Sequence, residues 1–453
     1  MTLSPAQAPE PAAQPHTLMR AHRAILSAVC SVAAANLVVK LAAMSKEMAV
    51  AAAFGRTDAL EAFLAALLIP NLLVNLLAES MNQSLIPTLV RVREQEGAER
   101  AQQLFSSTLL WLVVLLIAVS VFMLVAAPLA IPVVSSNFAP AKRTLTTALY
   151  CALLPIVLLS GIASNCTAVL ASRDRFLAPA LAPALVSLTM LATLAAGGMR
   201  TGIWWMVWAT LAGTLLQALT TASLLHRHGY HFSLRWHGAT PAVREVGRKY
   251  LPVLGSSLVA SAGLLVDQAM AASLRPGSVA GLAYANRFVN VMLTLLAGTI
   301  ATAVVPSFSR LLAHGEWENC RTTVRHWTLI CFAASAPLTL SLIVLSRWLV
   351  QLTLQHGAFH PSDTREVAHV MVLYALQIPF FVASRVDYRL IVALGRTDLV
   401  LWCGMINLVL DVVLNLALMR VLGLAGIALA TSLWTVSTFL FLRYWSERLM
   451  RDP

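Results

Sequence analysis

Long apolar stretches recur along the whole chain, and short polar segments separate them. A helix needs about 20 consecutive apolar residues to cross the hydrocarbon core of a bilayer. The pattern therefore predicts an all-α integral membrane protein with twelve transmembrane helices. The expected helices span residues 24–51, 59–90, 104–128, 145–170, 176–197, 203–226, 248–273, 278–308, 326–347, 367–394, 398–419 and 423–445.

The composition of the chain agrees with this pattern. Hydrophobic residues make up 58% of the chain and charged residues only 11%, whereas about 25% of the residues in a soluble domain are charged. No long polar segment remains for a soluble catalytic domain, so we expect no catalytic residue and no cofactor. The six cysteines are scattered without metal-ligand spacing, and we expect no metal site.

The net charge of +12 reflects where the basic residues lie. They gather in alternate loops, for example between Arg91 and Arg100 and between Arg227 and Lys249. Such a bias is typical of cytoplasmic loops, so both termini are expected in the cytoplasm. We interpret the positive charge as a topology signal and expect no nucleic-acid partner.

An internal repeat predicts two similar halves. The segment LLAESMNQSLIPTLVR at 76–91 resembles LLAGTIATAVVPSFSR at 295–310, and LASRD at 170–174 more weakly resembles LGRTD at 394–398. Spacings of about six helices predict two pseudo-symmetric six-helix halves around a central cavity. The expected divisions are a disordered cytoplasmic N-terminus (1–19), the first half (20–226), a cytoplasmic linker (227–247), the second half (248–446) and a cytoplasmic tail (447–453).

The first expected helix carries charges inside an apolar stretch. In VVKLAAMSKEMAVAAAFG, residues 38–55, these charges are Lys40, Lys46 and Glu47. A charge at the bilayer centre costs roughly 2.5–3.5 kcal/mol on insertion scales, so such residues normally face a bundle interior or an aqueous cavity. Lys40 and Glu47 share nearly one helix face, and Lys46 lies about 120° from Lys40. With Arg287 of the eighth helix, the two lysines would suit a doubly anionic group such as a pyrophosphate.

Other ionisable residues within or near the spans allow two interpretations. They either pair between helices to hold the bundle together or take part in function, and the sequence leaves this open for most of them. They are Glu61, Glu79, Asp267, Asp411, Arg385, Asp387 and Arg389. The positions of Glu61 and Asp267 make them candidates for coupling to an ion such as Na⁺ or H⁺.

Two segments carry a resemblance to a known family. Residues 46–89 contain a basic–acidic pair, FG, EAF, PN followed by two leucines, AES and PTL, and residues 266–311 contain GSV, YANRF and PSFSR. Together these motifs resemble the MurJ (MviN) family of lipid II flippases, within the multidrug/oligosaccharidyl-lipid/polysaccharide exporter superfamily. The remainder, from about residue 24 to 446, is similar to the family in its helix pattern alone.

The resemblance implies roles for individual residues. Lys40, Lys46 and Arg287 fall where the family has arginines lining a central cavity, so it implies that they bind the substrate diphosphate. Together with the residues singled out by position, the candidate cavity or ion-coupling residues are Glu47, Glu61, Asn75, Glu79, Asp267 and Asn286, and Arg385, Asp387 and Arg389 remain unassigned. The chain departs from the family pattern at the two lysines, at Val74-Asn75 in place of paired arginines, at Asn286 in place of an aspartate, and in having twelve expected helices rather than fourteen.

The implied function is a flippase in the bacterial cytoplasmic membrane. It would move a polyprenyl-diphosphate-linked glycan, lipid II or an exopolysaccharide unit, to the outer leaflet, driven by the membrane potential or by a Na⁺ or H⁺ gradient. The sequence has no nucleotide-binding phosphate loop. One alternative is a cation-coupled multidrug exporter, whose cavity should be acidic or aromatic. Two others are a non-transporting scaffold in envelope synthesis and an enzyme that uses histidines of the outer loop 348–366. We interpret that loop as solvated, and the histidines at 226–237 as part of the linker.

Overall fold

The computed structural model describes residues 15–135, 138–171, 177–197, 202–313 and 317–451; the side chains of 15–33, 133, 134, 171, 178, 256, 259, 260, 295, 297–313 and 397 lie outside the described part. Within these ranges the chain forms helices and no strand, and each of the twelve expected ranges overlaps a helix or consecutive helices. The elements are α1 (Pro15–Phe54), α2 (Asp58–Leu73), η1 (Val74–Glu79), α3 (Ser80–Glu96), α4 (Ala98–Val125), α5 (Ala127–Val134), α6 (Pro140–Leu153), α7 (Pro155–Ala171), α8 (Leu177–Leu181), α9 (Ala184–Ala195), α10 (Trp204–Arg227), α11 (Pro241–Ala272), α12 (Ser278–Ala313), α13 (Trp317–Val344), α14 (Ser346–Leu354), α15 (Pro361–Ala375), α16 (Ile378–Ala393), α17 (Thr397–Leu422) and α18 (Leu424–Leu449).

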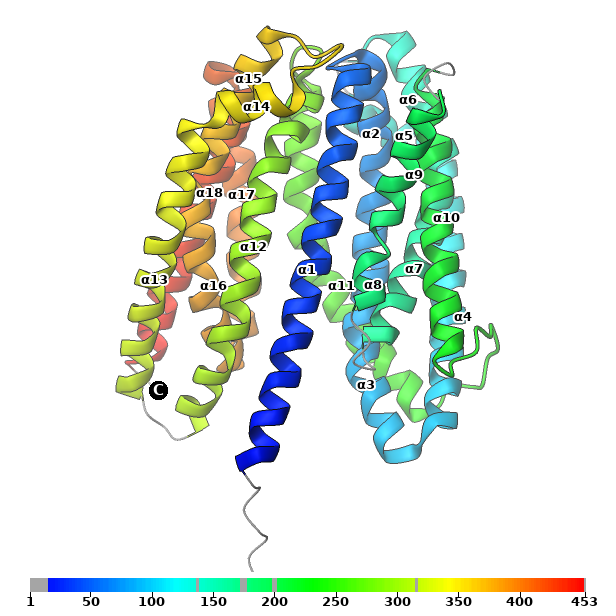
Figure 1. Ribbon diagram of the computed structural model, residues 1–453, viewed down its shortest axis with the longest axis vertical. Coiled ribbons are helices and arrows are strands. Elements are labelled where there is room, and N and C mark those ends of the chain that lie inside the picture. Colours follow the sequence, from blue (N-terminus) through cyan, green and yellow to red (C-terminus); the bar gives the residue numbers. More distant parts are fainter. Residues whose placement is uncertain (1–14, 136–137, 172–176, 198–201, 314–316, 452–453) are drawn as a thin grey trace, which may run out of the picture.

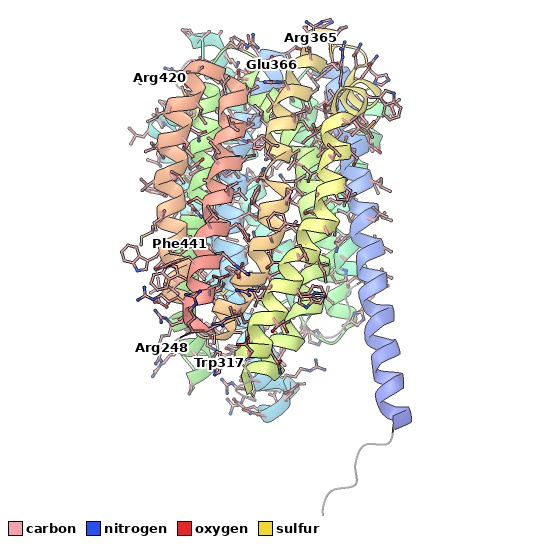
Figure 2. The ribbon with its side chains drawn as sticks, turned by 90° about the vertical axis from the view of Figure 1, so that its left-hand side faces the viewer. Arg248, Trp317, Arg365, Glu366, Arg420 and Phe441 are labelled. Atoms are coloured by element: carbon pink, nitrogen blue, oxygen red, sulfur yellow. The ribbon has the colours of Figure 1, made fainter. Side chains whose placement is uncertain are left out.

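The helices run side by side along one long axis (Figure 1). Helices α2–α10 form the N-terminal side, α12–α18 form the C-terminal side, and α1 and α11 lie between them. The start of α1 and the end of α18 both lie at one end of the bundle, which we call the base, and the opposite end is the apex. Figure 2 places Arg365, Glu366 and Arg420 at the apex and Arg248 and Trp317 at the base.

The outer surface of the bundle is apolar, as a lipid-facing surface must be. Large hydrophobic side chains are widely exposed, with Val421 81% and Leu129 79% accessible. Among the described residues, seven helical segments are long and apolar enough to span a membrane, or eight if the bent pair α6 and α7 is one span. The protein is therefore an all-α membrane protein, while the full number of twelve spans stays a prediction.

The N-terminal end of the chain falls partly outside the described residues. Residues 1–14 of the expected disordered segment 1–19 are not described, and α1 begins at Pro15. The repeat partner of Arg91, Arg310, also has a side chain outside the described part. At 1.5 Å per residue, the 40 residues of α1 extend about 60 Å, about twice the bilayer core.

The second expected helix is not a single α-helix. It consists of α2, a π-helical turn η1 at Val74–Glu79, and α3. Pro70 near the end of α2 lacks the N–H that would continue the α-helical hydrogen bonding, which favours an irregular turn close by. After that turn, the buried residues of α3 pack in one cluster with residues of α4, α7 and α11; they are Met81, Leu85, Leu89 and Val92.

At the base, α11 is tied to α3 by an ion-pair network. Arg91 contacts the Glu245 carboxylate, and the Lys249 ammonium donates to it at 2.7 Å. The hydrogen bond from Lys249, together with the charges of Lys249 and Arg91, holds the pKa of the Glu245 carboxyl below its usual range. A lowered carboxyl pKa means that the network stabilises the fold at neutral pH and weakens as the pH falls through that pKa.

The segment between the two sides is partly helical. Within the expected linker 227–247, α11 begins at Pro241, and the Thr240 hydroxyl accepts a hydrogen bond from the Val243 N–H at 3.4 Å. Tyr230 is buried against the Phe105 ring, with ring centroids 5.4 Å apart. Among the described residues, including the histidines of 226–237, no cluster of His, Cys, Asp or Glu could hold a metal ion.

Candidate functional site

A cavity of about 240 Å³ lies inside the bundle. Its walls come from α1, α2, α7, α9 and α10 on one side and from α12 on the other. Three charged residues line it: Lys46, Glu47 and Arg287. The site therefore joins charges from two helices that are more than 200 residues apart in sequence, as the expected central cavity requires.

One carboxylate holds both cations of the cavity. The Glu47 Oε1 atom lies 2.9 Å from Lys46 Nζ and 3.2 Å from Arg287 Nη2. The Glu47 side chain is only 13% exposed, whereas 58% of the Arg287 side chain is accessible. The Arg287 guanidinium thus has one anchored face and further N–H groups free to bind an anion in the cavity.

Four other candidate residues are not among those that line the cavity. Lys40 is half-buried, six residues before Lys46, and is not among the cavity-lining residues. Asn286 accepts a hydrogen bond from Asn290 at 2.9 Å, Asn75 is exposed on the π-helical turn, and exposed Glu79 lies 3.5 Å from the Asn82 amide. Their predicted roles in binding or coupling remain predictions.

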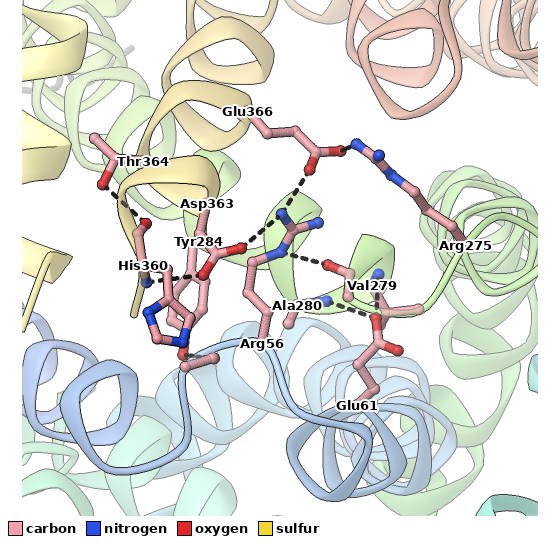
Figure 3. Close-up of polar contacts among 12 residues, drawn as sticks. Arg56, Glu61, Arg275, Val279, Ala280, Tyr284, His360, Asp363, Thr364 and Glu366 are labelled. Carbon is pink, nitrogen blue, oxygen red and sulfur yellow. Dashed lines mark hydrogen bonds and ion pairs between the residues drawn. The ribbon is translucent and has the colours of Figure 1, made fainter. Parts of the chain in front are cut away.

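At the apex, Arg56 connects the two sides of the bundle (Figure 3). Its Nε donates to the Gly277 carbonyl oxygen at 2.8 Å, and its Nη1 pairs with Asp363 at 3.3 Å and Glu366 at 2.6 Å. Arg275 binds the other oxygen of Glu366 at 2.6 Å. Sequence reasoning missed this network, because Arg56 and Arg275 looked like ordinary outer-loop charges.

A second apex network centres on Glu61, which is 1% exposed. Its Oε2 lies 2.5 Å from Lys142 Nζ, and its Oε1 accepts hydrogen bonds from the backbone N–H groups of Val279 at 2.8 Å and Ala280 at 3.4 Å, as Figure 3 shows for the backbone contacts. These amides belong to the first turn of α12, where a carboxylate satisfies N–H groups that lack helical partners. Glu61 therefore joins the two sides at the apex and does not line the cavity.

Two hydrogen bonds to backbone carbonyl oxygens of the α1 end add further contacts at the apex. The Ala358 N–H donates to the Ala52 carbonyl oxygen at 2.9 Å, and the Tyr284 hydroxyl donates to the Gly55 carbonyl oxygen at 3.1 Å. Gly55 and Gly357 have φ angles of +56° and +59°, and a Cβ on either would lie 2.2 Å from a carbonyl oxygen of the facing segment. We call this contact of 52–55 with 357–358 the glycine lock.

The loop 348–366 is therefore only partly solvated, in contrast to the expectation from sequence. Its histidines His356 and His360 are exposed, whereas Phe359 is 2% exposed and packs against the Tyr284 ring. The His360 N–H donates to Asp363 at 2.9 Å, which caps the start of α15. The loop folds against α1 because two glycines allow the backbones to approach.

A buried polar cluster joins α11 to α17 and α18. The Asn415 amide donates to Asp267 at 2.8 Å and to Asp411 at 3.1 Å, and the Thr431 hydroxyl lies 3.4 Å from Asp267. Across the described residues, no basic side chain pairs with either aspartate. Two carboxylates in an apolar environment need a proton or a cation as compensation. The cluster brings Asp267, a predicted ion-coupling residue, together with Asp411, for which the sequence left open a structural or a functional role.

The charged group on α16 lies outside the cavity. Asp387 is buried and accepts a hydrogen bond from the Ser446 hydroxyl at 2.6 Å, with Arg443 at 3.5 Å. The Arg385 guanidinium stacks over the Phe381 ring at 4.1 Å, and Arg389 is exposed. Asp387 therefore connects α16 to α18. Such a contact between helices is one of the two roles that the sequence left open for this residue.

Comparisons with known proteins point to one family. The model of the family described as "Lipid II flippase MurJ" matches residues 50–451. A "Probable lipid II flippase MurJ" from Synechocystis sp. is 26% identical over 443 residues, covering 93% of this chain and 82% of the relative.

Solved structures share the fold. The chain is similar to a "Lipid II flippase MurJ, inward closed conformation", with a TM-score of 0.78, 19% identity, and coverage of 92% of this chain and 87% of the other. It is equally similar to an inward-facing multidrug resistance MATE family transporter of the MOP superfamily, with a TM-score of 0.78, 13% identity and coverage of 94% and 98%. The architecture is therefore common to flippases and drug exporters, and the lining of the cavity has to discriminate between them.

Proposed function

Because the chain belongs to the MurJ family of lipid II flippases, we propose that it moves a polyprenyl-diphosphate-linked glycan precursor, such as lipid II, from the inner to the outer leaflet of the bacterial cytoplasmic membrane. Such transport supplies peptidoglycan synthesis or, with another glycan, a surface polysaccharide. The protein is thus a multi-pass membrane transporter rather than an enzyme. The observation that carries the proposal is the triad of Lys46, Glu47 and Arg287 in the cavity.

The triad suits a diphosphate for an electrostatic reason. Glu47 keeps two cations close together, and the N–H groups that do not face the carboxylate can donate to phosphate oxygens. Two cations and one carboxylate leave one positive charge in excess, which attracts a diphosphate in a cavity shielded from bulk water. The apolar chain of the lipid would remain in the bilayer while the headgroup crosses between the two sides.

The alternative of a cation-coupled multidrug exporter fits the cavity less well. A site for cationic drugs requires acidic or aromatic side chains that face the ligand. Here the only carboxylate among the described lining residues, Glu47, is already paired with two cations, and the most accessible charge belongs to Arg287. The cavity favours an anion.

We place the apex on the outer side of the membrane and both termini in the cytoplasm, following the charge bias of the loops. In this orientation, the Arg56 network, Glu61 and the glycine lock close the outer end of the cavity. Transport then requires these contacts to break and the base of the bundle to close. The two sides would rock about the cavity, as in other transporters built from repeats.

The drive would come from a cation that binds the cluster of Asp267, Asp411, Asn415 and Thr431. These side chains provide only oxygen and amide groups, which are suitable ligands for Na⁺, and the carboxylates can alternatively accept a proton. Each elementary charge that moves through the field gains about 2.3 kcal/mol per 100 mV.

Complementation tests the main proposal. We expect the native chain to rescue a bacterium whose own MurJ is shut off, and we expect Lys46→Ala and Arg287→Ala to reduce transport by about 10- to 100-fold, the effect of losing one charge-assisted hydrogen bond. Survival and the amount of lipid II in the outer leaflet are the measurements.

Arg389→Ala is the matched control, because it removes an exposed arginine outside the cavity. Lys46→Arg should retain transport, because the charge is kept. If Arg287→Ala reaches the membrane and still rescues fully, the diphosphate site is not where we place it. No rescue by a well-expressed native chain would redirect the proposal to another lipid-linked glycan.

The coupling cation is tested with Asp267→Asn. We expect transport in vesicles to lose most of its dependence on the Na⁺ or H⁺ gradient, because one carboxylate of the cluster is neutralised. Asp387→Asn is the control, since that buried aspartate bonds to Ser446 in a separate contact. Unchanged gradient dependence in Asp267→Asn would remove the cluster from the coupling mechanism.

A further inference from the structure

The cavity distributes its polar groups unequally. Its charges lie on α1 and α12, whereas its uncharged polar side chains, apart from Tyr284 with its hydroxyl bonded to the Gly55 carbonyl oxygen, lie on helices of the N-terminal side. These are Asn71 on α2, Ser160 on α7, and Thr210, Thr214 and Gln217 on α10. The cavity-lining residues described on α12 add only Ala283 and Tyr284 to Arg287.

The residues of α10 form one continuous face. Thr210, Thr214 and Gln217 are spaced four and three residues apart, which places them on the same side of a helix. The two threonine hydroxyls donate to carbonyl oxygens of their own helix, Thr210 to Met206 at 2.6 Å and Thr214 to Thr210 at 2.7 Å. Their oxygens can still accept hydrogen bonds from a ligand.

Three of the neutral groups have hydrogen-bonding capacity to spare. In the part of the chain that the structure describes, the side chains of Asn71, Ser160 and Gln217 make no hydrogen bond to another residue; Asn71 is exposed, and Ser160 and Gln217 are partly accessible. Inside an apolar bundle, such groups are costly unless a ligand or water satisfies them. Two amides and a hydroxyl offer both donors and acceptors without charge, which is the complement of a sugar with hydroxyl and acetamido groups.

We infer that this wall, formed by Asn71, Ser160 and Gln217, is a saccharide subsite that binds the sugar attached directly to the diphosphate. The inference rests on the proposed function, because it requires the diphosphate to sit at Lys46 and Arg287. The described cavity holds about 240 Å³, less than the roughly 300–1,000 Å³ of a site that encloses a whole drug-sized ligand. It therefore selects the first sugar and leaves the distal part of the glycan outside.

A pair of short-chain probes tests the subsite on the full-length purified chain. One probe is farnesyl diphosphate, and the other is farnesyl diphosphate carrying one N-acetylglucosamine. We expect the native chain to bind the sugar-bearing probe more tightly. Gln217→Leu combined with Ser160→Ala should weaken that probe about tenfold and leave farnesyl diphosphate unchanged, because only contacts to the sugar are lost.

Thr220→Val is the matched control, since its hydroxyl donates to the Leu216 carbonyl oxygen at 2.7 Å and does not line the cavity. Unchanged affinity for the sugar-bearing probe, or equal weakening of both probes, in the double variant overturns the subsite. If the native chain binds both probes equally and Arg287→Gln weakens both, the subsite fails while the diphosphate function stands. If the native chain binds neither probe, both proposals fall.

Discussion

Replacing Glu61 by alanine is expected to destabilise the folded protein by about 3–5 kcal/mol, the usual cost of removing one partner of a buried ion pair. Glu61 is 1% exposed and is the partner of the buried Lys142 ammonium at 2.5 Å. Its second oxygen accepts hydrogen bonds from the Val279 and Ala280 amides at the start of α12. The substitution therefore removes the buried partner of the Lys142 ammonium, which keeps only the exposed Asp58, and leaves two buried N–H groups without their acceptor.

The free energy of unfolding of the detergent-solubilised protein measures this effect. Asp58→Ala is the matched control, because Asp58 also pairs with Lys142 at 2.6 Å but its side chain is 64% exposed. We expect that control to cost about 1 kcal/mol or less. Lys142→Met added to Glu61→Ala should restore part of the loss, because it removes a buried ammonium that has lost its buried partner. Equal costs for Glu61→Ala and Asp58→Ala would show that burial does not govern this contact.

Gly357→Ala is expected to have the second large effect, a loss of about 2–5 kcal/mol. A non-glycine residue in the left-handed region costs about 1–2 kcal/mol, and forcing an extra methyl group into a packed contact costs about 1–3 kcal/mol more. The Gly357 φ angle is +59°, and a Cβ there would lie 2.2 Å from the Ala52 carbonyl oxygen. The glycine lock must open to accommodate the methyl group.

Gly395→Ala separates the two contributions. Gly395 follows the end of α16 with a φ angle of +74°, and nothing lies within 4 Å of a Cβ at that position. It should show only the backbone cost of about 1–2 kcal/mol. The comparison uses the same unfolding measurement, and transport by Gly357→Ala should change as well, because the outer end of the cavity is closed by this lock. If both variants lose the same stability, the close approach at Gly357 is not limiting.

The sequence predicts the fold and the charged part of the site for a clear reason. Apolar runs report the helices directly, and a charge inside such a run is costly enough to imply a polar partner, as for Lys46, Glu47 and Arg287. Arg56 and Lys142 carry no such signal, because basic residues at helix ends are common. The Arg56 partner Glu366 is 310 residues away in sequence, so only the tertiary structure reveals the pair.

The neutral wall of the cavity was also beyond sequence reasoning. Ser160 and Gln217 sit in apolar helices, where single uncharged polar residues are tolerated and usually bond within their own helix. Their common orientation toward one cavity depends on how α7 and α10 pack. For Glu61, the sequence indicated a position in or near a membrane-spanning helix. It did not indicate the ion pair with Lys142 or the hydrogen bonds from the start of α12.

The π-helical turn η1 acts as a phase shift within one membrane segment. A turn closed by bonds to the fifth residue contains one residue more than an α-helical turn, and each residue of an α-helix corresponds to about 100° of rotation. The extra residue rotates α3 about the segment axis relative to α2. As a result, Phe63 and Asn71 of α2 face the cavity, whereas Met81 and Leu85 of α3 pack against neighbouring helices. One continuous segment can thus face the substrate cavity above the turn and the neighbouring helices below it. Deleting a single residue between 74 and 79 would rotate everything that follows, which makes the length of this turn as constrained as its composition.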